Sequence, residues 1–339
     1  MGEELNVETV AKYMSGRIEG FSGSLTAEKT ATGQSNPTFI LTHSTGKVVL
    51  RRKPSGELLK SAHAVDREFR VMAALADTDV PVPKMHFLCE DQDVIGSTFF
   101  VMEFIDGRNF MDPRVPDVIP ETRRGMYNAM NAGLAALHSV DIQAVGLADF
   151  GKPGNYFARQ ISRWSGQYRT SETETIPAMN DLITWLDGNT PDDKTTSLVH
   201  GDWRIDNLMF AAQGADLVGI LDWELSTLGH PLADLGAQLM QWAMPVGLEG
   251  RGLDGVDRDA LGIPEDREYI ELYAKRAGLS DAPDMDFYVA FSFFRMAAIL
   301  QGVKRRALDG NASNPAQALR LGAFVPIFAG KGLQIVNEE

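Results

Sequence analysis

The chain has 339 residues, of which 44% are apolar and 23% are charged, a composition typical of a globular protein of about two domains. Its 32 basic residues stand against 46 acidic ones, so the net charge is −14. This balance disfavours nucleic acid as the main partner, because the phosphate backbone rewards an excess of positive charge. It leaves a small-molecule substrate open.

The cysteine content and the apolar segments bear on the compartment. Cys89 is the only cysteine, so no internal disulfide can form, and this favours a reducing cellular compartment. The N-terminal residues lack the basic and apolar regions of a signal peptide. The most apolar window, residues 287–303, contains Arg295 and Gln301 and is predicted to be a buried helix rather than a membrane span. We therefore expect a cytoplasmic protein that does not enter a membrane.

Three β-type segments come early in the chain, at residues 24–30, 37–42 and 47–53. The loop between the first two is rich in Gly, Ser and Asn, so its backbone N–H groups can turn towards phosphate oxygens and Ser35 can add a hydroxyl. Along the third strand, alternation puts Arg51 and Lys53 on one face, where a clamp on nucleotide phosphates requires a cation. An ordinary hairpin loop and an exposed basic strand end are the simpler alternatives.

A helix is predicted over residues 62–76, because Val65, Phe69 and Met72 recur at helical spacing. Glu68 falls on the same inward stripe, where a carboxylate is costly unless it meets a cation. Arg51 or Lys53 on the neighbouring strand is the natural partner, and which of the two contacts phosphates stays open. A solvated helix edge is the alternative interpretation.

A hinge is predicted where the strand at residues 98–103 runs into a turn at 104–107. Main-chain groups of Glu103 and Ile105 would be free there to bond the edge of an adenine. The chain then divides into an N-terminal nucleotide-clamping lobe, residues 1–105, and a C-terminal catalytic and substrate lobe, residues 106–339.

The most informative stretch is LVHGDWRIDNLMF at residues 198–210, followed by VGILDWE at 218–224. One apolar strand leads to Asp202 and Asn207, and a second ends on Asp222. Kinases use this layout, with one Asp to accept a hydroxyl proton and an Asn and a second Asp to hold Mg²⁺ on ATP. Each match alone would be an ordinary turn or cap, and a metal hydrolase would need further ligands around His200. The joint pattern predicts a kinase-type site.

The second half is predicted to be mainly helical, with helices at residues 156–168, 232–242, 266–277 and 286–308. The first of these carries Arg159 and Arg163 one turn apart beside Trp164, which is either a site for an anionic acceptor or a solvated face. Asp234 follows Asp222 by only 12 residues, too few for the long activation segment of a protein kinase. A small-molecule acceptor is therefore expected, and Asp234 is interpreted as a structural tie for the catalytic loop.

With these residues in place, the chain resembles the aminoglycoside phosphotransferase family over nearly its whole length. The segments VLRRKP at 49–54, SAHAVDRE at 61–68, VPVPK at 80–84, FVMEF at 100–104 and GNYFARQ at 154–160 carry a closer resemblance. They are similar to the kinase-like domain fused to some acyl-CoA dehydrogenases and to its stand-alone bacterial relatives. The resemblance implies an α+β, two-lobed protein-kinase-like fold, with an N-terminal antiparallel sheet plus helix and a mainly helical C-terminal lobe.

The resemblance also implies roles for the motif residues. Asp202 would be the catalytic base, and Asn207 and Asp222 would be the Mg²⁺ ligands. Glu68 would pair with the strand cation, which aligns as Arg51 where the family has a lysine.

Nucleotide contacts are implied at the hinge, from Glu103 and Ile105 under the side chain of Met102. His230 stands where many relatives of the wider family carry Asp before the proline. ATP and Mg²⁺ are the implied cofactors, and members of the closer subgroup are associated with phosphorylating hydroxyacyl-CoA thioesters.

We therefore predict an ATP- and Mg²⁺-dependent phosphotransferase that moves the γ-phosphoryl group to a substrate hydroxyl, with a hydroxyacyl-CoA as the first candidate acceptor. A kinase for an aminoglycoside, choline or homoserine-like alcohol is one alternative. A catalytically silent nucleotide-binding module is another, which the intact Asp202, Asn207 and Asp222 disfavour. Fold and catalytic loop are shared across many acceptors, so the motifs do not identify the acceptor.

Overall fold

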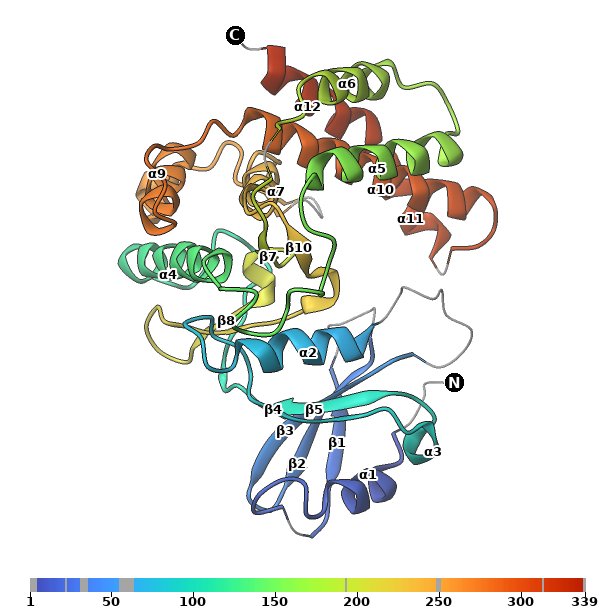
Figure 1. Cartoon of the computed structure of the whole chain (residues 1–339), viewed down its shortest axis with the longest axis vertical. Coiled ribbons are helices and arrows are strands. Elements are labelled where there is room, and N and C mark those ends of the chain that lie inside the picture. Colours follow the sequence, from blue (N-terminus) through green and yellow to red (C-terminus); the bar gives the residue numbers. More distant parts are fainter. Residues whose placement is uncertain are drawn as a thin grey trace.

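The structure is a computed structural model that describes residues 5–21, 23–30, 36–54, 64–192, 194–247, 251–312 and 314–337. Ser35 lies outside the described residues, so its predicted phosphate contact stays a prediction. A sheet-containing lobe and a helical lobe are stacked along the long axis of the molecule (Figure 1). This architecture agrees with the two-lobed α+β kinase-like fold expected from the sequence.

The N-terminal lobe is built on a five-stranded antiparallel sheet in the order β1-β2-β3-β5-β4. Its strands are β1 (Thr26–Lys29), β2 (Thr38–His43), β3 (Gly46–Arg52), β4 (Met85–Cys89) and β5 (Phe99–Glu103). One face packs on α1 (Val7–Met14), beside the short α3 (Gln92–Ile95), and the other packs on α2 (Val65–Leu75). The alternation of β3 follows from this, because Val48 and Leu50 join the core on the α1 side while Val49 joins the core on the α2 side.

The chain passes between the lobes directly after β5. Strand β6 (Gly107–Arg108) already pairs with β8 of the C-terminal lobe. A side chain at Gly107 would collide with the carbonyl oxygen of Phe210, which a Cβ would approach to 2.5 Å. A glycine at the start of β6 therefore allows the crossing segment to lie flat on the larger lobe. The division at residue 105 itself stays a prediction.

The C-terminal lobe holds two small sheets, β10-β7 and β6-β8-β9. Their remaining strands and the short 3₁₀ turns among them are β7 (Ser197–Val199), η1 (Ile205–Asn207), β8 (Leu208–Ala211), β9 (Leu217–Ile220), η2 (Trp223–Leu225) and β10 (Thr227–Gly229). The helices are α4 (Pro120–His138), α5 (Tyr156–Ser171), α6 (Pro177–Gly188), α7 (Leu232–Trp242), α8 (Arg258–Leu261), α9 (Asp266–Arg276), α10 (Asp286–Leu308), α11 (Pro315–Gly322) and α12 (Val325–Asn337).

Helix α10 lies at the centre of the helical half of this lobe, packed by α5, α7, α11 and α12 (Figure 1). The expected bounds of α7 and α10 agree with the structure, and α10 is the buried helix predicted from the apolar window. Gly236 of α7 faces the backbone of α10, and a Cβ there would stand 2.7 Å from the carbonyl oxygen of Tyr288. The two helices can therefore approach closely only because position 236 lacks a side chain.

Within the described ranges, one segment, Pro315–Asn337, is long and apolar enough to cross a membrane when judged by length and composition alone. It is folded as two helices, α11 and α12, rather than as a single straight one. Phe328 packs against Phe293 of α10, with ring centroids 5.8 Å apart, and Val325 and Ala329 are buried. The segment is thus explained as part of the apolar covering of α10.

Candidate active site

The predicted catalytic loop leaves β7 at Val199 and turns sharply at Gly201. This glycine has φ of +81°, and a Cβ on it would lie 2.5 Å from the carbonyl oxygen of Leu225. A larger residue would therefore need both a left-handed backbone and a displaced neighbouring turn. The glycine of the HGD motif is thus required by the local geometry, and it sets the position of Asp202.

Asp234 at the start of α7 anchors this loop. Its carboxylate accepts the backbone N–H groups of His200 at 2.7 Å and Gly201 at 2.8 Å, and it lies 3.2 Å from Nε2 of His138. Burial alone would raise the pKa of Asp234, but the hydrogen bond and charge of His138 outweigh it and lower the pKa. Asp234 is therefore the structural tie expected from the sequence, and His138 is a packed helix-end residue that also bonds Tyr273.

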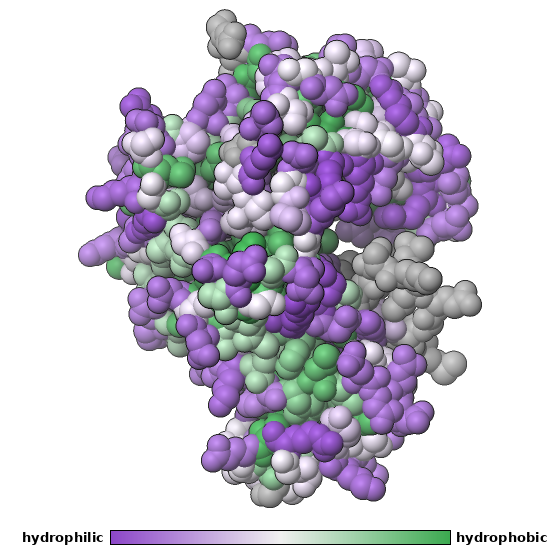
Figure 2. Space-filling model, viewed as in Figure 1, coloured by the Kyte–Doolittle hydropathy of each residue, from purple (hydrophilic) through white to green (hydrophobic). Residues whose placement is uncertain are grey.

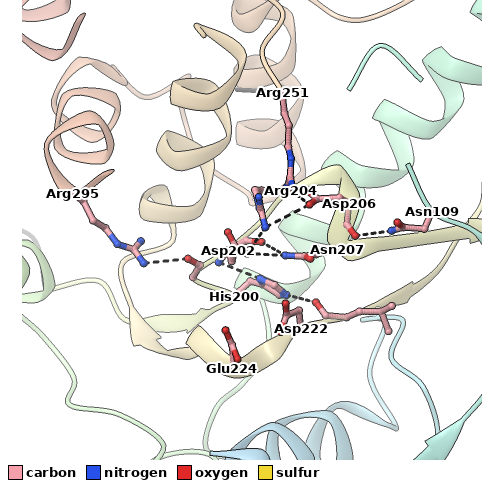
Figure 3. A network of polar contacts seen from close by, with 12 residues as sticks. Asn109, His200, Asp202, Arg204, Asp206, Asn207, Asp222, Glu224, Arg251 and Arg295 are labelled. Atoms are coloured by element: carbon pink, nitrogen blue, oxygen red, sulfur yellow. Dashed lines mark hydrogen bonds and ion pairs between the residues drawn. The ribbon is translucent and has the colours of Figure 1, made fainter. Parts of the chain in front are cut away.

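Asp202 is held by two side-chain donors. Asn207 donates through Nδ2 to the carbonyl oxygen of Asp202 at 2.8 Å and to its Oδ2 at 3.0 Å. Arg204 donates from Nη2 to the same Oδ2 at 2.9 Å (Figure 3). The carboxylate is thus fixed in one orientation at the end of the loop, as a base that must meet an acceptor hydroxyl has to be.

Asp222 follows β9 in a left-handed conformation, with φ of +64°. The neighbouring Leu221 donates its N–H to the carbonyl oxygen of Asn207 at 2.8 Å, and its own carbonyl lies 2.9 Å from Nε2 of His200. These bonds join the segment of Asp222 to the catalytic loop. Asp202, Asn207 and Asp222 are therefore brought together, as the sequence predicted.

Arg51 is the strand cation that meets Glu68. Its Nε lies 3.0 Å from Oε2 of Glu68, and its Nη2 lies 2.7 Å from Oδ1 of Asp222. Glu224 adds a third carboxylate at 3.8 Å. Burial is the main reason that the pKa of Glu68 rises to about 8; the charge of Arg51 opposes the rise, and Asp222 and Glu224 support it. The predicted contact between the strand cation and the helix carboxyl is present.

Of the two cations offered as the partner of Glu68, Lys53 is the one that the structure places elsewhere. Strand β3 ends at Arg52, and the Nζ of Lys53 pairs with Asp66 at 3.0 Å, near the start of α2. Lys53 does not line the cavity between the lobes, whereas Arg51 does. The alternation argument was right about the shared face, but the carboxylate that is nearest to each cation decides which of them turns inward.

A cavity of about 720 Å³, called here the cleft cavity, lies between the lobes and is lined by most of the predicted nucleotide residues. Arg51, Glu68, Met102, Glu103, Ile105, Asn207 and Asp222 all line it. One expectation at the hinge is wrong in part, because the N–H of Glu103 is not free and donates to the carbonyl oxygen of Lys84 at 2.8 Å. Strand β5 ends at Glu103, as expected, but its pairing beside β4 already occupies this N–H group.

The oxygen-bearing side chains at this cleft fit a hard cation such as Mg²⁺. Among the residues that the structure describes there is no cluster of three or more His, Cys, Asp or Glu that could bind a metal alone. Mg²⁺ in kinases does not need such a cluster, because it is bound by one or two protein oxygens together with substrate phosphates. Asn207 and Asp222 both line the cleft and would provide such oxygens.

A second cavity, called here the apolar chamber, has a volume of about 290 Å³ and begins at Asp202. Its walls are largely apolar side chains of α7, α10, α11 and α12, among them Ala237, Met240, Met296, Ile299 and Phe328. Asp202 is the only carboxylate among the described residues that line it. The sequence analysis missed this chamber, because its walls come from helices that are distant in the chain.

The arginines predicted to bind an acceptor lie near this chamber without lining it. Arg159 donates to the carbonyl oxygen of Lys152 at 2.6 Å, and the guanidinium of Arg163 lies 5.3 Å from the ring centroid of Trp164. Arg295 of α10 stands 5.9 Å from the same ring and does line the chamber. Hydrophilic residues gather over the α5 side of this lobe (Figure 2).

Arg295 is the residue that the sequence analysis did not single out at this place. It donates to the carbonyl oxygen of Gly201 at 3.4 Å, next to Asp202 (Figure 3). One feature of the sequence could have pointed to Arg295: it is a charged residue within an otherwise apolar predicted helix. Among the described residues, Arg159, Arg163 and Arg295 have no carboxylate partner.

A cleft lies between a sheet lobe and a helical lobe, with Asn207 and Asp222 among its lining residues and Asp202 bonded to Asn207 beside it. This is the arrangement of a kinase-like phosphotransferase. A profile of the phosphotransferase enzyme family, APH, matches residues 26–279. The chain is 46% identical over 309 residues to acyl-CoA dehydrogenase family member 10 from Mus musculus. The alignment covers 91% of this chain and 29% of that protein. It is 39% identical over 336 residues to acyl-CoA dehydrogenase family member 11 from Homo sapiens. That alignment covers 97% of this chain and 43% of the relative. The chain belongs to the phosphotransferase enzyme family.

Solved structures agree with this assignment. A crystal structure of a candidate aminoglycoside phosphotransferase from Ralstonia eutropha is 48% identical, with a TM-score of 0.90 over 98% of both chains. Spectinomycin phosphotransferase is 11% identical, with a TM-score of 0.65 over 98% of this chain and all of that one, and shares the fold. The chain spans less than half the length of the two acyl-CoA dehydrogenase family members named above. It is a phosphotransferase enzyme.

Proposed function

We propose that this enzyme transfers the γ-phosphoryl group of ATP to a hydroxyl group of an acyl-CoA, with Mg²⁺ as the cofactor. The convergence of Asp202, Asn207 and Asp222 beneath the Arg51–Glu68 pair carries the proposal of phosphoryl transfer. It combines a fixed base, oxygen donors for a hard cation and a buried cation on the opposite lobe, which are the parts that this reaction needs.

Asp202 would accept the proton of the acceptor hydroxyl. The hydroxyl oxygen would form a bond to the γ-phosphorus while the bond from that phosphorus to the β,γ-bridging oxygen breaks, leaving ADP. Mg²⁺, when bound by Asn207 and Asp222, would neutralise charge on the phosphates. Arg51, held by Glu68, would orient them, and the segment Glu103 to Ile105 under Met102 would receive the adenine.

The acceptor is proposed from the second cavity. The apolar chamber starts at the predicted base and is walled by aliphatic and aromatic side chains, which suits an acyl chain. A CoA moiety carries several phosphates, and Arg159, Arg163 and Arg295 lie nearby without carboxylate partners among the described residues. The names of the two relatives that are quoted above also refer to acyl-CoA.

Cationic acceptors such as choline or an aminoglycoside fit this chamber less well. A site for ammonium groups needs several carboxylates, or aromatic faces without competing cations. Asp202 is the only carboxylate among the described lining residues, and Arg204, Arg251 and Arg295 line the chamber together with its aromatic rings. A silent nucleotide-binding module is disfavoured because Asp202 is oriented by both Asn207 and Arg204, an arrangement that nucleotide binding alone does not need.

The test is a transfer assay with a matched acceptor panel. Purified enzyme is incubated with ATP and Mg²⁺ and with 3-hydroxyacyl, 4-hydroxyacyl and unsubstituted acyl-CoAs of equal chain length, with choline and an aminoglycoside in parallel. Mass spectrometry should detect a phosphorylated product from a hydroxyacyl-CoA, none from the unsubstituted thioester, and ADP in equal amount. Turnover of choline or the aminoglycoside alone would refute the acyl-CoA proposal but leave the phosphotransferase assignment intact.

A further inference from the structure

Two arginines separate the cleft cavity from the apolar chamber. Among the described residues, Arg204 and Arg251 are the two that line both cavities. Arg204 comes from the catalytic loop, and Arg251 comes from a segment between α7 and α8, some distance along the chain. A phosphoryl group that passes from a nucleotide in one cavity to a hydroxyl in the other must cross this pair.

A single buried carboxylate holds the two arginines. Arg251 donates to Oδ2 of Asp206, and Nη2 of Arg204 lies 3.5 Å from the same oxygen (Figure 3). The side chain of Asp206 is only 7% exposed, whereas those of Arg204 and Arg251 are 30% and 28% exposed. Asp206 is itself fixed by its backbone, since its carbonyl oxygen accepts from Asn109 at 2.6 Å. The carboxylate is therefore an internal anchor, and the guanidinium groups are accessible from the cavities.

We infer that Arg204 and Arg251 contact the phosphoryl group in transit and that Asp206 is the positioning residue for both. This inference rests on the proposed phosphoryl transfer, and it adds two catalytic residues to that reaction. In the transition state the bond to the β,γ-bridging oxygen is breaking, the bond to the acceptor oxygen is forming, and negative charge lies on the three equatorial oxygens. Two planar guanidinium groups at the junction can hydrogen-bond those oxygens.

The charges around the junction support a role in the transition state rather than in ATP binding. Asp202 and Asp206 balance Arg204 and Arg251 before reaction. When Asp202 takes the proton of the acceptor, it no longer neutralises Arg204, so the junction gains one unit of positive charge as the phosphoryl group arrives. Arg51 lies on the nucleotide side of the junction, beside Glu68 and Asp222, and it does not line the apolar chamber.

Arg251→Ala is the cleanest variant, because Arg251 touches Asp206 and not Asp202. The control is Arg124→Ala, which removes an exposed arginine paired with Glu268, outside both cavities. Three quantities are measured: slow ATP hydrolysis with water as acceptor, the affinity for a non-hydrolysable ATP analogue with Mg²⁺, and the affinity for ADP with Mg²⁺ and aluminium fluoride as a transition-state mimic. None of them depends on the identity of the natural acceptor.

We expect Arg251→Ala to lower hydrolysis and the affinity for the aluminium fluoride complex in parallel, by about 10²–10³-fold, as for other donors to a transition-state oxyanion. The affinity for the ATP analogue should change far less. Arg251→Lys should recover part of the loss, because it keeps the charge without the planar fork. Asp206→Asn should reproduce the selective loss, since it releases both arginines.

If Arg251 only ties its segment to the catalytic loop, Arg251→Ala will lower the melting temperature but change both affinities equally, which would overturn the inference. Parallel behaviour of Arg251→Ala and Arg124→Ala would also overturn it. Failure of the wild-type enzyme to bind or hydrolyse ATP is a different outcome, because it would contradict the proposed function itself.

Discussion

The Nη2 of Arg51 lies 2.7 Å from Oδ1 of Asp222, so a cation of the N-terminal sheet bonds a carboxylate of the C-terminal lobe. The Nε of the same guanidinium lies 3.0 Å from Oε2 of Glu68. A metal ion at Asp222 and the guanidinium of Arg51 would therefore compete for one carboxylate. Binding of a metal–nucleotide complex should shift Arg51 from Asp222 towards the phosphates, which couples the two lobes to occupancy of the cleft.

Asp222→Ala should remove most of the Mg²⁺ dependence of nucleotide binding. The variant loses a donor oxygen for the metal, whereas the hinge and Arg51 remain to bind the nucleotide. Isothermal titration of ADP with and without Mg²⁺ measures this directly, with Asp149→Ala, an exposed acid outside both cavities, as the control. If the variant kept the metal dependence of the wild type, Asp222 would be only a residue that ends a strand.

Glu68→Gln should change how stability depends on pH. Burial raises the pKa of Glu68 to about 8, so the folded protein keeps a proton on this carboxyl that the unfolded chain releases near its ordinary pKa of 4.5. Between these two values the folded state binds more protons, and stability must therefore fall as the pH rises towards 8. Glutamine is neutral throughout and lacks this contribution.

Melting temperatures of the wild type and of Glu68→Gln, measured from pH 5 to pH 9, test this prediction. The difference, wild type minus variant, should decrease as the pH rises and should level off above about pH 8. A difference that stays constant across the range would show that Glu68 is ionised throughout, held so by Arg51.

Asp202→Asn should slow transfer while nucleotide binding persists. Asparagine keeps the shape and can still accept from Asn207 and Arg204, but it cannot take the hydroxyl proton. General-base contributions are about 10²–10⁴-fold, and turnover should fall by that factor. Steady-state kinetics with an equilibrium measurement of ADP affinity separates the two effects. Unchanged turnover would remove Asp202 from the role of base.

Replacing Arg159 and Arg163 together with alanine should weaken acyl-CoA binding by about 1.5–3 kcal/mol for each charged hydrogen bond that is lost. ATP affinity should barely change, because neither residue lines the cleft cavity. Arg169→Ala, on the same helix but bonded to Glu172 and Asn180, is the matched control. Titration calorimetry with a hydroxyacyl-CoA measures both affinities. Equal acyl-CoA affinity in the double variant and the wild type would place the CoA phosphates elsewhere.

Sequence reasoning succeeded where a pattern is local. The bounds of α7 and α10 followed from helical spacing, and the Arg51–Glu68 pair followed from combining strand alternation with an inward helix stripe. Strand β4 was missed for a physical reason. Most of its residues are half-buried on both faces, so it shows no alternation, and it follows two prolines.

Only the site residues that belong to a short sequence motif could be predicted. Asp202, Asn207 and Asp222 lie within one short stretch of chain, so their spacing is informative by itself. Arg251 and Arg295 reach the same place from distant segments, and only the packing of the helices shows that they do. Lys53 was assigned to the correct face of its strand. The sequence could not show, however, that Asp66 rather than Glu68 would be the carboxylate nearest to it.

The reacting groups lie on the strand-and-loop segment between β7 and η2, whereas the chamber walls are mostly side chains of α7, α10, α11 and α12. If the apolar chamber binds the acceptor as proposed, acceptor preference and phosphoryl chemistry are encoded in largely separate stretches of the chain. Exchanging residues along these helices between relatives should redirect the enzyme to alcohols of other sizes at little cost in catalytic rate. Such separation makes one catalytic loop reusable for many acceptors.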